Sequence, residues 1–150
     1  MLGLFVLAGC GFAPVYGDAG RLHGSIAFTT PETVAGYRLG ERLEERLGVA
    51  NAPRYTLHVT LTQSRASSAI TEDGNTTRFK IIGRGNWVLR DNATGDEIEK
   101  GVVDAFTSYS TTASTTATQS AETDAVARLS VILADMIVGR LLILGPKIAQ

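Results

Sequence analysis

Apolar and polar residues alternate over residues 54–70, in the middle of the chain. Because successive side chains of a strand point to opposite faces, this period predicts a strand with one buried and one exposed face. Such a half-buried strand is typical of an antiparallel sheet. The expected core face carries apolar side chains and the other face hydroxyl and imidazole groups: Tyr55, Leu57, Val59 and Leu61 against Thr56, His58, Thr60 and Thr62.

Two further strands are predicted after this one. Asp73-Gly74 is a strong hairpin signal, because a type I′ turn needs positive φ. The next strand follows over 77–91, and a turn at 91–97 leads into another over 97–110. We expect the glycines in the first of these strands to let a bulky group pack close or the strand bend. Its expected core-facing residues are Phe79, Ile81, Gly83, Gly85, Trp87 and Leu89.

Two segments with helical periodicity flank the strands. Residues 31–47 predict a helix with Thr30 as its N-cap and Gly48 just after its end. A second helix is expected from Ser120 to the Gly145-Pro146 pair, after a polar connection rich in serine and threonine. Its expected buried stripe contains Ala121, Ala125, Leu129, Ile132, Leu133, Met136, Ile137 and Leu141.

A short strand within residues 22–30 completes the order β-α-β-β-β-α. The predicted fold class is α+β, with two helices packed on one face of a four-stranded, mainly antiparallel sheet. The length of 150 residues suits one such domain, which we expect over 21–150.

Composition excludes several classes of function. The formal net charge of −1 provides no basic field for nucleic acid. One cysteine cannot form an internal disulfide, and with only His23 and His58 beside it a structural zinc site lacks ligands. We therefore expect no metal, no other cofactor and no nucleic-acid partner.

The single cysteine directly follows an apolar run. Leu7-Ala8-Gly9-Cys10 has the pattern of a bacterial lipobox, in which the leader is cut before the cysteine and the thiol receives a lipid. This predicts a signal peptide over 1–9 and a lipidated tether over 10–20. The predicted signal peptide departs from the usual pattern in that it contains no Lys or Arg. The alternative is a small buried cysteine behind an apolar N-terminal strand.

Signals for catalysis are weak. His58 lies among threonines on the expected exposed face, and no G-x-S-x-G motif accompanies it. A small periplasmic hydrolase that depends on His58 stays open as a minor alternative, because residue types alone do not exclude a Ser-His-Asp arrangement.

A stripe of cations is expected on the outer face of the strand 77–91. Arg78, Lys80, Arg84 and Arg90 share one parity, and Ile82 and Val88 lie between them. The stripe spans about 40 Å at 3.3 Å per residue, and it suits an amphiphile that carries phosphates and acyl chains. The plainer explanation is that these cations protect a sheet edge from pairing.

Several features of the chain are typical of one family: Cys10-Gly11-Phe12 with the following A-P-V-Y-G, the element order, and the amphipathic terminal helix with Arg128 and Arg140. In these features the chain resembles the LptE family of lipopolysaccharide-assembly lipoproteins, in its alphaproteobacterial form. The resemblance implies a non-enzymatic protein, anchored through Cys10 on the periplasmic side of the outer membrane, that plugs the barrel protein LptD and assists lipopolysaccharide delivery. The Thr-rich faces would contact the barrel, and the cation stripe is the candidate site for lipid A phosphates. An auxiliary lipoprotein of an ABC-type lipid transporter is the alternative.

Overall fold

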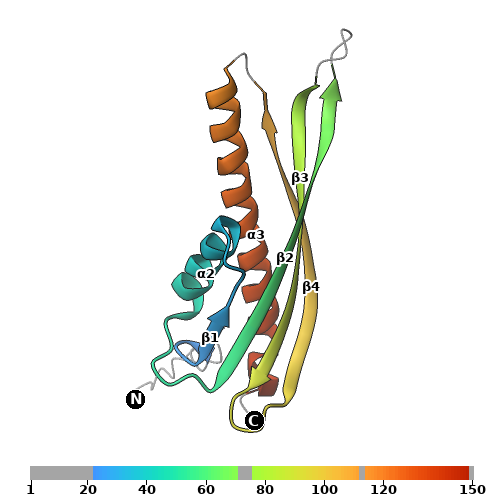
Figure 1. Ribbon diagram of the computed structural model, residues 1–150. Coiled ribbons are helices and arrows are strands. Elements are labelled where there is room, and N and C mark those ends of the chain that lie inside the picture. Colours follow the sequence, from blue (N-terminus) through green and yellow to red (C-terminus); the bar gives the residue numbers. More distant parts are fainter. Residues whose placement is uncertain (1–21, 71–75, 112–113, 149–150) are drawn as a thin grey trace, which may run out of the picture.

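The computed structural model describes residues 22–70, 76–111 and 114–148, so Cys10, the lipobox and the Asp73-Gly74 turn lie outside the described residues. The element order is the predicted β-α-β-β-β-α (Figure 1). The elements are β1 (Ile26–Thr29), α2 (Val34–Leu47), β2 (Tyr55–Ile70), β3 (Thr76–Asp91), β4 (Glu97–Ser110) and α3 (Thr115–Ile148).

The four strands form one sheet in the order β1-β2-β3-β4. β1 runs parallel to β2, from the pair Ile26–Tyr55 to the pair Thr29–His58, whereas β2–β3 and β3–β4 are antiparallel. The predicted fold class is therefore confirmed, with the short first strand making the sheet mixed. β3 lies in the interior of the sheet, hydrogen-bonded on both sides.

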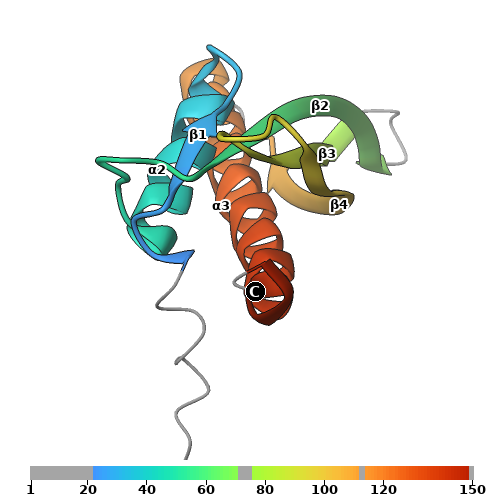
Figure 2. The same ribbon diagram turned by 90° about the horizontal axis from the view of Figure 1, so that it is seen from below.

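Both helices lie on the same side of the sheet. Figure 2 shows α3 passing between the α2–β1 pair and the curved strands β3 and β4. The core is built from the odd-numbered positions of β2, β3 and β4 together with one stripe of each helix, and its residues at 0% exposure include Leu39, Leu43, Leu57, Leu89, Leu129, Leu133, Ile137 and Leu141.

At Gly83, α3 packs closely on the sheet. A Cβ built on Gly83 would lie 2.8 Å from Leu129 Cδ2 and 3.1 Å from Leu133 Cδ1. The absence of a side chain at this position lets two leucines of α3 sit directly on β3. This confirms the expectation that a bulky group packs close to the strand here.

The start of α2 differs from the prediction. The helix begins at Val34, and its N-cap is Thr33, not Thr30. Thr33 has extended backbone angles, and its Oγ1 accepts a 3.1 Å hydrogen bond from the Gly36 amide, which satisfies one of the free amides of the first turn. The predicted end is confirmed, because Gly48 follows Leu47 with φ 76°.

Both ends of α3 were predicted wrongly. The helix begins at Thr115, five residues before Ser120, because Ser114 is its N-cap. The Ser114 Oγ accepts a 3.3 Å hydrogen bond from the Ala117 amide, and the Ser114 carbonyl accepts one from the Thr118 amide. The helix also continues past the Gly145-Pro146 pair to Ile148. A proline so close to the end of a helix costs few backbone hydrogen bonds and does not stop it here.

The buried stripe of α3 is narrower on one flank than predicted. Ile132 and Met136 are 39% and 40% exposed, whereas Ala134, Val138 and Ser130 are buried. The buried stripe consists of every fourth residue from 125 to 141 and of the neighbouring row 130, 134 and 138. Residues 132 and 136 lie on the other side of the first row and are therefore exposed. The Ser130 hydroxyl donates to the Val126 carbonyl at 3.1 Å, which satisfies it in the core.

An ion pair joins the two helices. Arg42 Nε and Nη2 donate to the two carboxylate oxygens of Asp135 at 2.9 and 3.0 Å. These hydrogen bonds, with those to Glu45, raise the pKa of Arg42. A bidentate contact of this kind attaches α2 to α3 and also fixes the orientation of one helix relative to the other.

Candidate functional site

One face of the sheet is covered by neither of the two described helices, and we call it the outer face. It is formed by the even-numbered positions of β2, β3 and β4, whose odd-numbered positions face the helices. The four cations predicted to share a face, Arg78, Lys80, Arg84 and Arg90, have the parity of this outer face, and all are exposed or half-buried.

The plainer explanation for these cations does not hold. Protection of a sheet edge requires an edge strand, and β3 is paired along its length with both β2 and β4. The free edges of the described sheet are β4 on one side and, on the other, β1 together with the part of β2 beyond the short β1. The cations of β3 therefore do not serve to block edge pairing.

Two of the cations are neutralised by carboxylates on β4. Arg84 Nε donates to Asp104 Oδ1 at 2.7 Å, and this hydrogen bond raises the pKa of Arg84. Arg90 Nη2 lies 3.7 Å from Glu97 Oε2. A hydrogen bond from Lys100 lowers the pKa of Glu97, which therefore stays ionised beside Arg90. The register of β3 and β4 creates both pairs, because Arg84 lies opposite Asp104 and Arg90 opposite Glu97.

The other two cations are not paired with a carboxylate in the described part of the chain. The Lys80 ammonium lies 4.5 Å from the centre of the Phe106 ring, a cation–π contact that leaves its charge uncompensated. Arg78 forms no ion pair with any described residue. Of the four predicted positions, Arg78 and Lys80 are thus the ones available to a bound anion.

Exposed apolar side chains lie among these charges. Ile82 and Phe106 face each other across β3 and β4, and they are 42% and 61% exposed, beside Val102 at 52%. Ile82 was predicted to lie on this face, whereas Phe106 and Val102 were not. The strand over 97–110 was predicted correctly, and the even parity of these residues was the signal that could have placed them on the same face.

The β2 side of the outer face is rich in hydroxyl groups. Thr60 and Thr62 are exposed there, Thr56 is half-buried, and Ser64 lies opposite Ile82. The outer face thus divides into a hydroxyl strip on β2 and an amphipathic strip on β3 and β4.

The described residues contain little that suggests catalysis or metal binding. His58 is exposed on the hydroxyl strip, and no hydrogen bond joins it to a carboxylate among the described residues. The described part of the chain also holds no cluster of three His, Cys, Asp or Glu side chains suited to a metal. No described helix combines the length and apolar character needed to cross a membrane.

Comparison with known proteins gives consistent matches. A family model described as LptE, lipopolysaccharide-assembly, matches residues 24–141. No curated protein matches the chain.

Three solved structures share the fold at low sequence identity. A protein assigned as a lipoprotein from Caulobacter crescentus CB15 is 23% identical with a TM-score of 0.71, covering 85% of this chain and 96% of its own. Rare lipoprotein B from Shewanella oneidensis is 14% identical with a TM-score of 0.63, covering 84% and 98%. A minor lipoprotein from Acinetobacter baumannii is 19% identical with a TM-score of 0.64, covering 80% and 91%.

Proposed function

The chain belongs to the LptE family of lipopolysaccharide-assembly lipoproteins, and we propose that it binds lipopolysaccharide on the amphipathic strip of its outer sheet face while partnering an LptD-like barrel in the outer membrane. Since the family is one of lipopolysaccharide-assembly lipoproteins, we expect no catalytic role for His58. The observation that carries the proposal is the mixture of uncompensated cations and exposed apolar side chains on β3 and β4.

The chemistry of this strip matches that of lipid A, which presents phosphates next to acyl chains. Lys80 places an ammonium group beside the exposed Phe106 ring, so one region offers a cation and an apolar contact together. Arg78 lies two residues further along the same face and offers a guanidinium that can hold phosphate oxygens in a two-pronged contact.

The paired cations contribute differently. The charge of Arg84 is already compensated by Asp104 at 2.7 Å, so a phosphate that binds its remaining N–H groups gains less free energy than it would beside an unpaired cation. The charge of Arg90 is also partly compensated, by Glu97 at 3.7 Å. We therefore rank Arg78 and Lys80 above Arg84 and Arg90 as phosphate-binding residues.

The hydroxyl strip on β2 is our candidate for the barrel contact. The exposed hydroxyls of Thr60 and Thr62 hydrate easily and can also bond to a polar wall, and the lumen of an outer-membrane barrel is polar. The strip lies beside the amphipathic strip and does not overlap it, so barrel and lipid can be bound at once.

Charge reversal tests the lipid site. Arg78→Glu with Lys80→Glu should strongly weaken binding of purified lipopolysaccharide to the isolated protein, while co-purification with the barrel stays unchanged. The matched control reverses Arg38 and Arg46, which carry the same charge on α2 and lie on the helix side of the molecule. Equal loss in both double variants would show a general charge effect and contradict the proposed site.

Co-purification also tests the partner. The detergent-solubilised protein should bring down one large barrel subunit. Recovery of ATPase and permease subunits without a barrel would instead support the auxiliary transporter lipoprotein.

Lipid attachment at Cys10 completes the proposal, with residues 1–9 removed and 10–20 acting as a tether to the domain over 21–150. Stable membrane attachment needs more than one acyl chain, which lipidation of an N-terminal cysteine supplies. Intact-mass measurement should give a mature chain that begins at Cys10 and carries added acyl mass. A Cys10→Ser variant should keep Met1 and lose the added mass, and a wild-type chain with the unprocessed mass would refute the anchor.

A further inference from the structure

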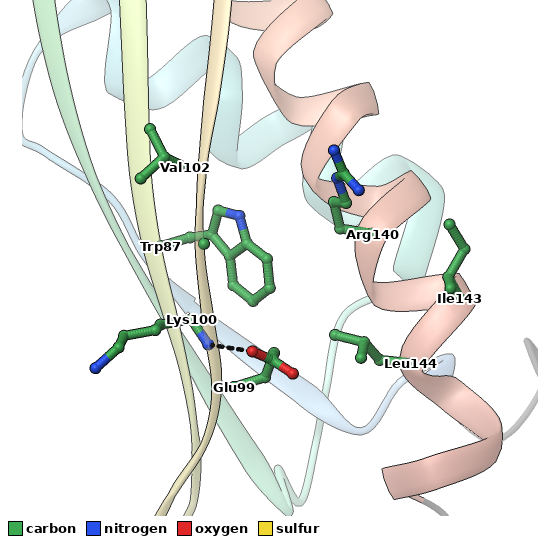
Figure 3. Close-up of a pocket in the computed structure, with 8 residues that line it drawn as sticks. Trp87, Glu99, Lys100, Val102, Arg140, Ile143 and Leu144 are labelled. Carbon is green, nitrogen blue, oxygen red and sulfur yellow. Dashed lines mark hydrogen bonds between the residues drawn. The ribbon is translucent and has the colours of Figure 1, made fainter.

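A pocket of about 290 Å³ lies between the last turns of α3 and the strand pair β3–β4 (Figure 3). It is on the helix side of the sheet, behind the outer face, and at the same end of the molecule as β1 (Figure 1). The described residues that matter for its chemistry are Trp87, Glu99, Gly101, Arg140, Ile143 and Leu144.

The wall of this pocket contains a buried donor with no acceptor. Trp87 is 3% exposed, and its indole N–H has no hydrogen-bond partner among the described residues. The indole lies over Gly101, where a Cβ would come within 2.7 Å of the ring. In Figure 3 the nitrogen is on the edge of the ring turned toward Arg140. A buried N–H left without an acceptor loses the hydrogen bond that it makes to water in the unfolded chain, so an acceptor atom in the pocket would restore a hydrogen bond.

The charges around the pocket balance. Glu99 and Arg140 both line it, and neither forms an ion pair with another described residue. Lys100 also lines it, but its ammonium lies 2.9 Å from Glu97 and points away from the indole. One negative and one positive side chain favour a ligand with no net charge.

The rest of the wall is aliphatic. Ile143 is 72% exposed at the rim, and Leu144 lies next to it. The pocket volume is about ten times the volume that one molecule occupies in liquid water. It is at the lower limit of the volumes found for small-molecule sites. The pocket therefore suits a short apolar segment that carries one neutral acceptor.

We propose that this pocket binds the ester carbonyl and the first part of one acyl chain of a membrane glycerolipid. The carbonyl oxygen accepts the Trp87 N–H, the ester adds no charge between Glu99 and Arg140, and the chain lies against Ile143 and Leu144. The site lies mainly on the helix side of the sheet, whereas the proposed lipopolysaccharide surface lies on the outer face. Val102, an exposed residue of that outer face, also lines the pocket where it borders β4. The proposal concerns the pocket alone and does not rest on the proposed lipopolysaccharide site.

Trp87 is the chain's only tryptophan, so its indole N–H gives a single NMR signal that reports on the pocket. The full chain with Cys10→Ser, which removes the proposed anchor, is titrated with 1-decanoylglycerol below its micelle concentration. The matched ligand is 1-decylglycerol ether, in which a methylene replaces the carbonyl. The ester should move the indole signal downfield and saturate, and the ether should bind roughly tenfold more weakly, as expected for one lost hydrogen bond.

Variants locate the site without relying on the indole. Ile143→Asn should weaken ester binding measured by calorimetry, and Trp87→Phe should reduce the preference for the ester over the ether. Val49→Asn removes an apolar side chain of similar exposure, 68% against 72% for Ile143, that does not line the pocket, and it should leave binding unchanged.

Three results would overturn the proposal. An indole signal that neither ligand moves would mean that the pocket holds water only. Equal binding of ester and ether would mean that Trp87 does not donate to the ligand. Tighter binding of decanoate than of the ester would mean that the pocket selects an anion.

Discussion

Gly83→Ala adds one methyl group where two leucines of α3 pack directly on β3. The new Cβ would be 2.8 Å from Leu129 Cδ2, 3.1 Å from Leu129 Cγ and 3.1 Å from Leu133 Cδ1. Both leucines are 0% exposed, so neither side chain can rotate away into solvent. The contact must be relieved by moving the helix and the strand apart, and such a shift disturbs the packing of the whole core.

The expected cost combines two opposing effects. Overpacking a core by one methyl group costs about 1–3 kcal/mol, and replacing a strand glycine by alanine returns up to about 1 kcal/mol through the unfolded chain. The middle of each range, about 2 kcal/mol of cost and about 0.5 kcal/mol of gain, gives a net loss in free energy of unfolding of about 1.5 kcal/mol. With a urea dependence of about 2 kcal/mol per molar, the unfolding midpoint should fall by roughly 0.5–1 M.

Gly139→Ala is the matched control. It is the same chemical change in the interior of α3, but a Cβ there would meet nothing within 4 Å. Alanine should stabilise the helix at this position by about 0.5–1 kcal/mol and raise the midpoint. Equilibrium urea unfolding, followed by circular dichroism, measures both variants. A Gly83→Ala protein as stable as the wild type would refute the close packing of α3 on β3.

Three further changes test other contacts, each by urea unfolding. Asp135→Asn should lower the midpoint, because Arg42 loses its two-pronged partner on α3; an unchanged midpoint would mean that the helices hold together without it. Gly101→Ala should also lower the midpoint and shift tryptophan fluorescence, since its Cβ would lie 2.7 Å from the indole. The depressed pKa of Glu97 adds stability that is complete above the pKa of a free glutamate and is lost as the pH falls through the folded value. Glu97→Gln should thus flatten the decline of the midpoint between about pH 5 and pH 3, and equal declines would contradict the contact with Lys100.

The strands were predictable because a single rule governs them. A period of two fixes which side chains share a face, so the parity that buries Trp87 also exposes Arg84. Helix ends follow no such rule. Thr30 and Thr33 are both competent caps, and the polar run before α3 offers many, so the choice between Ser114 and Ser120 depends on where the chain leaves β4.

The site was predictable only in part for a related reason. The common face of the four cations follows from β3 alone, but their partners depend on the register with β4. That register shifts between Leu89 and Arg90, which brings Arg90 opposite Glu97 and leaves Glu99 opposite Leu89. The pocket beside Trp87 depends on tertiary packing in addition, since α3 must cross β4 near Gly101 before the pocket exists.

The two-layer fold also determines where partners can bind. Both helices cover the same side of the sheet, so no described element covers the outer face, and Ile82, Val102 and Phe106 expose apolar surface there. Exposed apolar residues grouped on one face and bordered by polar side chains are typical of an interaction surface. Since this group lies on β3 and β4 and the hydroxyl strip lies on β2, a lipid and a protein wall can occupy the face side by side. We therefore expect changes at Lys80 to affect lipid binding alone and changes at Thr60 to affect the barrel alone, and a single substitution that abolished both would mean that the two strips form one interface.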